Sequence, residues 1–68
     1  MDPVIQVKAN PLSNETRKYM EDRGITPKGM EYQYPDYWEA MGQLGDGRLV
    51  IVRITADNQW GWFPATPD

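Results

Sequence analysis

The side chains that most often carry out catalysis are missing from this sequence, which contains no histidine and no cysteine. Their absence removes the commonest general base, the thiolate nucleophile and two of the best ligands for transition metals. Ser13 is the only serine, and no histidine is present to activate it, so a serine-type hydrolytic site is excluded. We therefore expect no enzyme activity, no cofactor and no metal site.

Three carboxylates are the remaining candidates for catalysis. Glu31, Asp36 and Glu39 lie among tyrosines and a tryptophan, as acids do in sites that cleave glycosidic bonds. Acids placed between aromatic residues also form the solvated rim around half-buried rings. The sequence favours this second interpretation, because so short a chain has little room to enclose a substrate.

Two short polar segments carry oxygen atoms that suit a hard cation, but they lack the required spacing. Neither residues 45–47 nor residues 57–59 match the twelve-residue calcium loop with its alternating ligands and closing glutamate. The glycines around Asp46 also lack the lysine and the hydroxyl residue of a phosphate-binding loop. Both segments predict turns.

Aromatic residues are concentrated at positions 32–38 and 60–63, which contain all of the three Trp, four Tyr and one Phe except Tyr19. A domain of this size has too thin a core to bury them all. Exposed Tyr and Trp are typical of surfaces that contact another protein. We therefore expect a partner-binding surface that contains Tyr32, Tyr34, Tyr37, Trp60, Trp62 and Phe63. The alternative is that these rings complete the small core, and both interpretations can hold at once.

Composition and charge set the class of protein. With 40% hydrophobic and 25% charged residues, the 68-residue chain has the composition of one globular domain, residues 1–68, with a loose tail after about residue 65. A formal net charge of -3 opposes binding to nucleic acid or to anionic membranes. The longest apolar run, residues 49–52, is far too short to span a bilayer, and the first residues lack a signal-peptide pattern, so a cytoplasmic location is expected.

The clearest local signals predict a helix over residues 13–23. Asn10 or Ser13 can serve as its N-cap, and Gly24 is suited to the positive φ that follows a helix end. Ile25 then supplies the apolar residue that packs back on the last turn. The stripe predicted to face the core consists of Leu12, Thr16, Tyr19, Met20 and Arg23.

The strands are predicted from alternation and from turn residues. We expect strands at residues 4–8, 37–44, 48–55 and 60–63, with turns at 45–47 and 56–59. Residues 25–36 are expected to be mostly irregular, because Pro27 and Gly29 interrupt them. The predicted fold class is α+β with the order β-α-β-β-β, in which one helix packs on a three-stranded antiparallel meander plus the N-terminal strand.

Alternation also separates the two faces of the sheet. In residues 37–44 it places Trp38 and Ala40 on one face and Tyr37, Glu39 and Met41 on the other. In residues 48–55 one face consists of Val50, Val52 and Ile54, and the other contains Leu49 and Ile51. Both faces of the second strand are therefore apolar near its start.

One short segment resembles a known family. Residues 61–65, Gly-Trp-Phe-Pro-Ala, are similar to a segment near the end of many SH3 domains, where it lines a groove for proline-rich peptides. The Ala-Leu-Tyr-Asp-Tyr motif of that family is absent and a helix precedes the hairpin, so no family is assigned.

The sequence leaves three functions open. The leading hypothesis is a non-enzymatic protein-binding or regulatory module, whose partner is a protein of unknown identity. The second is a small structural homo-oligomer subunit. The third is an inhibitor of a host protein, since phage and mobile-element inhibitors are often short and acidic.

Overall fold

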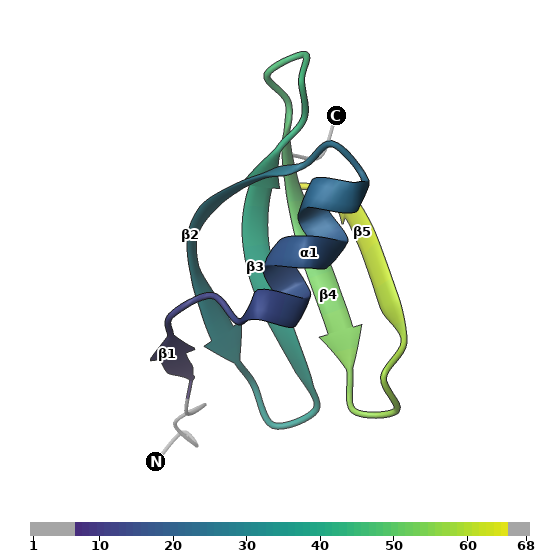
Figure 1. Ribbon diagram of the computed structural model, residues 1–68. Coiled ribbons are helices and arrows are strands. Elements are labelled where there is room, and N and C mark those ends of the chain that lie inside the picture. Colours follow the sequence, from purple (N-terminus) through teal and green to yellow (C-terminus); the bar gives the residue numbers. More distant parts are fainter. Residues whose placement is uncertain (1–6, 66–68) are drawn as a thin grey trace.

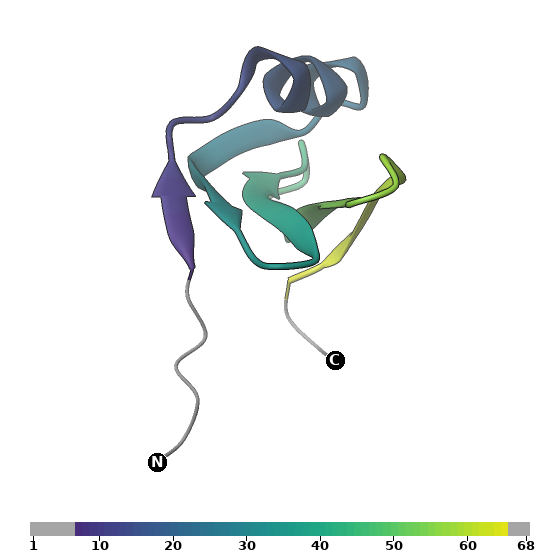
Figure 2. The same cartoon turned by 90° about the horizontal axis from the view of Figure 1, so that it is seen from below.

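The structure of the protein is a computed structural model that describes residues 7–65. Its elements are β1 (Lys8–Asn10), α1 (Asn14–Asp22), β2 (Thr26–Gln33), β3 (Tyr37–Gln43), β4 (Leu49–Thr55) and β5 (Trp60–Pro64). The five strands form one sheet in chain order, and every neighbouring pair is antiparallel (Figure 1). The helix lies on one side of this sheet, as the view from below shows (Figure 2). The predicted α+β architecture with one helix on an antiparallel sheet is therefore confirmed.

The helix starts as its sequence predicts. Ser13 is the N-cap, and its hydroxyl accepts a hydrogen bond from the backbone N–H of Thr16. This bond satisfies one of the donors that the first turn leaves without an intrahelical partner.

The helix end is a complete Schellman motif. Gly24 has φ +71°, its N–H donates to the carbonyl of Glu21, and the N–H of Ile25 donates to the carbonyl of Met20. Glycine takes this left-handed conformation without the steric cost that a Cβ brings. Ile25 is 2% exposed, so the apolar residue after the glycine packs into the core as expected.

The core-facing stripe of the helix is correct except at its last position. Thr16 and Met20 are buried and Tyr19 is half-buried. Arg23, which was predicted on the same stripe, is exposed. Its guanidinium carbon lies 3.6 Å from the centre of the Tyr19 ring. Stacking on the face of this ring lets the charged group keep its contact with water, so Arg23 stays at the surface.

The prediction that residues 25–36 are mostly irregular is wrong, because β2 occupies Thr26–Gln33. Its pairing with β3 shifts register between Pro27 and Glu31, and Gly29 in this stretch has φ +143°. A bulge of this kind accommodates both residues that argue against a strand, since proline and glycine are tolerated at bulges. The meander therefore has four strands, β2 to β5, rather than three.

The N-terminal strand lies further along the chain than predicted. Residues 8–10 form β1, which pairs with the end of β2 at the edge of the sheet, whereas a strand was predicted at residues 4–8. Residues 4–6 of that prediction lie outside the described residues. So does most of the tail predicted to be loose after residue 65.

Six hydrophobic residues are buried between α1 and the sheet: Met20, Ile25, Ala40, Val50, Val52 and Ile54. Four of them come from alternate positions of β3 and β4, so the predicted alternation of both strands is confirmed. The core is thin, and no other helix or strand of residues 7–65 packs on the far face of the sheet.

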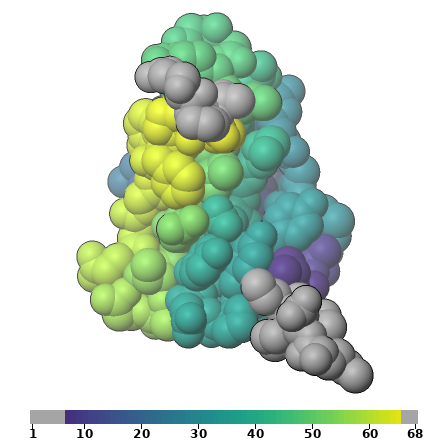
Figure 3. All heavy atoms as spheres, turned by 180° about the vertical axis from the view of Figure 1, so that it is seen from behind, coloured from purple at the N-terminus to yellow at the C-terminus, as the bar shows by residue number. Residues whose placement is uncertain are grey.

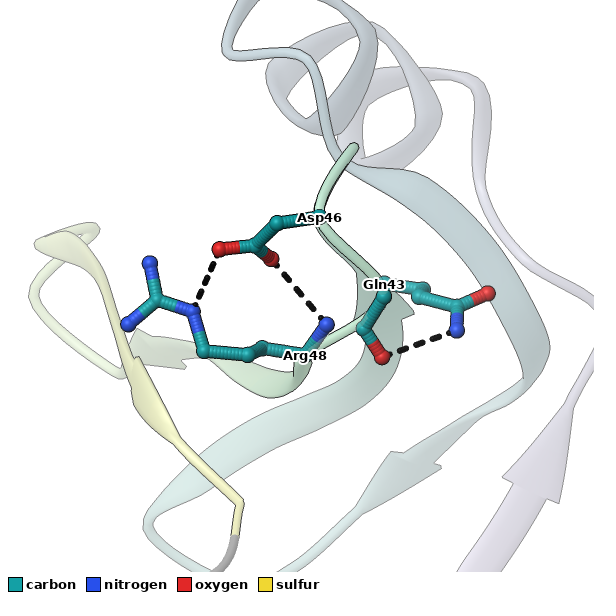
Figure 4. A network of polar contacts seen from close by, with 4 residues as sticks. Gln43, Asp46 and Arg48 are labelled. Atoms are coloured by element: carbon teal, nitrogen blue, oxygen red, sulfur yellow. Dashed lines mark hydrogen bonds and ion pairs between the residues drawn. The ribbon is translucent and has the colours of Figure 1, made fainter.

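The turn between β3 and β4 is the predicted three-residue loop. The Leu44 N–H donates to the Arg48 carbonyl, and Gly47, at φ +92°, donates back to the Leu44 carbonyl. Figure 4 shows that the Asp46 carboxylate accepts hydrogen bonds from both the backbone N–H and the Nε of Arg48. Gln43 donates from its side chain to the Gly47 carbonyl and closes the loop from the other strand.

These contacts predict the titration of Asp46. The hydrogen bond from the Arg48 backbone N–H, helped by the Arg48 side chain, lowers the pKa of Asp46 below its ordinary value of 3.8. A carboxyl group whose folded-state pKa is lowered stabilises the fold fully above its unfolded pKa, and this contribution is lost as the pH falls through the folded pKa. Carboxyl ¹³C NMR titration measures the value directly.

The variant Arg48→Ala should raise the pKa of Asp46 only part of the way, because the backbone N–H at residue 48 remains. An Asp46 pKa of 3.8 or above in the wild-type chain would show that these hydrogen bonds do not form in solution.

Candidate functional site

The face of the sheet that points away from α1 is the candidate site, and we call it the open face (Figure 3). Residues directly opposite one another on antiparallel strands project from the same face. One row across the open face is Tyr32, Glu39 and Arg53, and the next row is Met41, Ile51 and Phe63. Tyr37 and Leu49 project from the same face at the ends of these strands, by alternation.

Large apolar side chains remain exposed on the open face. Tyr32, Met41, Leu49 and Phe63 are each between 38% and 41% exposed. A single exposed apolar residue is ordinary on a protein surface, but a continuous group on one face is typical of an interaction site.

Arg53 lies at the centre of the open face and is held by aromatic rings. Its guanidinium carbon is 4.5 Å from the centre of the Tyr37 ring and 5.0 Å from that of Phe63. Its Nη2 lies 3.5 Å from Oε2 of Glu39 on the neighbouring strand. The Nε atom is buried and has no hydrogen-bond partner among the described residues. The arginine is thus oriented by its neighbours while part of its donor capacity is unused.

The tyrosines form one side of a shallow hollow. Tyr34 stacks on Tyr37 with ring centres 4.7 Å apart and 20° between the ring planes. The hollow beside these rings measures about 190 Å³. It is lined by Tyr32, Tyr34, Glu39, Ala40, Met41 and Ile51. A hollow of this size accepts a side chain rather than a whole small-molecule substrate, since ligand pockets usually measure about 300 to 1,000 Å³.

The structure divides the six residues predicted to bind a partner. Tyr32, Tyr34, Tyr37 and Phe63 gather on the open face. Trp60 and Trp62 oppose Ile54 and Val52 and therefore project from the helix side of β5. Trp60 stacks on Tyr19 with ring centres 4.8 Å apart, whereas Trp62 is 44% exposed. Alternate residues of one strand point to opposite sides, which separates Phe63 from both tryptophans.

Five members of the open face were not among the residues predicted to bind a partner: Met41, Leu49, Ile51, Glu39 and Arg53. Alternation within their strands already placed the first three opposite the core residues. The position of Arg53 between two rings depends on the register of three strands, for which the sequence carries no direct signal.

Two of the three acids considered for catalysis, Glu31 and Glu39, lie on opposite faces of the sheet. Glu31 opposes Ala40 on the helix side, where its carboxylate accepts hydrogen bonds from the hydroxyls of Ser13 and Thr16. Glu39 lies on the open face beside Arg53. Because the sheet separates Glu31 from Glu39, these two carboxylates cannot flank one scissile bond.

A second cavity, of about 250 Å³, lies where Glu31 meets the start of α1. The Glu31 carboxylate is used within the fold, since it accepts hydrogen bonds from the hydroxyls of the N-cap and of the first helical turn. A carboxylate beside a helix N-terminus also interacts favourably with the helix dipole. We assign this cluster to the stability of the helix start.

Within residues 7–65 no three potential metal-ligating side chains come together, and no helix is long and apolar enough to cross a membrane. The chain matches no protein-family profile, and comparison with curated proteins and with solved structures found no similar protein.

Proposed function

We propose that this chain is a non-enzymatic protein-binding or regulatory module, which contacts a partner protein in the cytoplasm through the open face. The observation that carries this proposal is the continuous group of exposed aromatic and aliphatic side chains on a sheet face that no described element covers. A sheet normally buries its apolar face against another layer, so a partner is the layer that this face lacks.

The chemistry of the open face supports a protein partner. Tyr, Phe, Met and Arg are enriched in protein interfaces, and Tyr and Arg often supply most of the binding energy. Arg53 is already oriented by the Tyr37 and Phe63 rings, so it loses little conformational freedom when a partner binds.

The experiment compares two substitutions of exposed apolar residues by glutamate on opposite sides of the sheet. Met41 is 39% exposed on the open face, and Trp62 is 44% exposed on the helix side. We expect Met41→Glu to weaken binding of an isolated, purified partner at least tenfold, because a charge is then buried in an apolar contact. The matched control Trp62→Glu should retain binding, which is measured by isothermal titration calorimetry.

Circular dichroism of both variants checks that they are folded. Loss of binding in Trp62→Glu but not in Met41→Glu would move the binding surface to the helix side of β5. Retention of binding in both variants would refute the proposal.

A further inference from the structure

We infer that the partner on the open face is a second copy of this chain, so that two sheets pack face to face in a symmetric dimer. This inference rests on the proposed function, because it names the occupant of the same surface. The open face of each copy would supply half of a new core that is built largely of aromatic rings.

The available area suits a small interface, of the kind that holds a weak dimer together. A buried aromatic side chain removes about 150 to 250 Å² from water, so a ring about 40% exposed still has roughly 60 to 100 Å² to bury. Eight large side chains form the open face: Tyr32, Tyr34, Tyr37, Met41, Leu49, Ile51, Arg53 and Phe63. Four of them, Tyr32, Met41, Leu49 and Phe63, have about that exposure, and the other four are half-buried and offer about half as much. Two copies would then bury roughly 700 to 1,200 Å² in total, which approaches the lower end of the range of about 1,200 to 2,000 Å² for specific interfaces.

The charges of the open face are self-complementary. Glu39 and Arg53 are the ionised side chains in its two central rows, so these rows are neutral although the whole chain carries -3. Two copies can therefore approach through this face without a net like-charge repulsion across these rows. A charged or strongly acidic face would instead have favoured a different partner.

A twofold axis would also place opposite charges of the two copies against each other. Glu39 and Arg53 are direct cross-strand neighbours on β3 and β4. Consider a twofold axis that lies between the two sheets, parallel to β3 and β4 and midway between them. This axis brings each Arg53 toward the Glu39 of the second copy, and the contact repeats by symmetry. The four charges alternate in sign, so each guanidinium gains a second carboxylate neighbour.

The size of the fold also favours a second layer. Residues 7–65 contain six buried hydrophobic residues and one nine-residue helix, and the sequence has no cysteine for a disulfide. Small domains without disulfides or metals are often stabilised by oligomerisation. Face-to-face packing of two sheets about 10 Å apart would convert the exposed rings into a closed core.

The test measures the mass of the full chain by analytical ultracentrifugation at concentrations from about 1 µM to 1 mM, a range that includes typical dissociation constants of weak and moderate dimers. We expect the mass to rise from the monomer value of 7.9 kDa toward twice that value. Met41→Glu should raise the dissociation constant at least tenfold, and Trp62→Glu, on the other side of the sheet, should leave it within about twofold.

Charge exchange tests the symmetric arrangement itself. Arg53→Glu places four acids around the twofold axis, and Glu39→Arg places four bases there, so each variant alone should be monomeric. An equimolar mixture of the two variants should form a heterodimer, because opposite charges then face each other. Circular dichroism checks the fold of each variant, and Arg53→Gln, which should weaken the dimer without adding like charge, replaces any variant that is unfolded.

The outcomes separate this inference from the proposed function. A chain that stays monomeric at every concentration, or a dimer that is insensitive to Met41→Glu and to both charge variants, overturns the inference. If the monomer still binds another purified protein in a manner lost in Met41→Glu, the proposed function stands while the second copy is excluded. If the chain neither forms a dimer nor binds another protein through this face, both the inference and the proposed function are refuted.

Discussion

Valine in place of Gly42 is expected to lower the folding stability by about 3 kcal/mol or more. Gly42 lies on β3 directly beneath the helix end, and an added Cβ would lie less than 3.0 Å from side-chain atoms of Ile25 and Met20. It would also lie 3.2 Å from the carbonyl oxygen of Thr26, which belongs to the backbone and cannot simply rotate away. Overpacking of this kind costs about 1 to 3 kcal/mol or more. The total stability of a domain of this size is roughly 3 to 10 kcal/mol.

A series at this position makes the prediction quantitative. Urea unfolding followed by tryptophan fluorescence should show Gly42→Ala less stable than wild type by about 1 to 3 kcal/mol, and Gly42→Val less stable still. The matched control is Gly45→Ala, where an added Cβ meets no atom within 4 Å and the change should stay within about 0.5 kcal/mol. Equal stability of Gly42→Ala and wild type would mean that α1 does not approach β3 this closely.

Local signals predicted the elements that depend on local contacts. Ser13 and Gly24 satisfy backbone groups within a few residues of themselves, so the helix bounds follow from residue type. The loop at residues 45–47 is similar, because its glycine meets a conformational requirement inside the turn. In both places the stabilising contacts lie within the sequence window that carries the signal.

The strand β2 could not be predicted in this way, because its local residues argue against it. Pro27 and Gly29 disfavour a regular strand, and both are accommodated by the shift in register that β2 makes against β3. Its stability comes from pairing with β3 across the next turn and with β1, whose partners lie far away in the chain, as Lys8 does from Gln33. Nonlocal pairing overrides propensity here, as it commonly does in sheets.

The candidate site was predictable in part. Alternation within Trp60–Pro64 separates Trp62 from Phe63, so grouping both tryptophans with the tyrosines disregarded a signal that was present. By contrast, Tyr32 joins the open face only because β2 is a strand. Arg53 becomes its centre only through the joint register of β3, β4 and β5.

Truncation of Met20 to alanine should cost about 2 to 5 kcal/mol of folding stability, the second large effect that the structure predicts. Met20 is 0% exposed and packs between α1 and the sheet, so removal of its side chain leaves a cavity in a core of six residues. A loss of this size is a large share of the roughly 3 to 10 kcal/mol available to such a domain. The measurement is the free energy of unfolding in urea, taken at one protein concentration for all variants.

Two variants show whether burial causes this loss. Met30 is 42% exposed, so Met30→Ala makes the same chemical change on the surface and should alter stability by about 0.5 kcal/mol or less. Met20→Leu keeps most of the volume and should cost less than about 1.5 kcal/mol. If Met20→Ala were no more destabilising than Met30→Ala, the helix could not be packed on the sheet at this position.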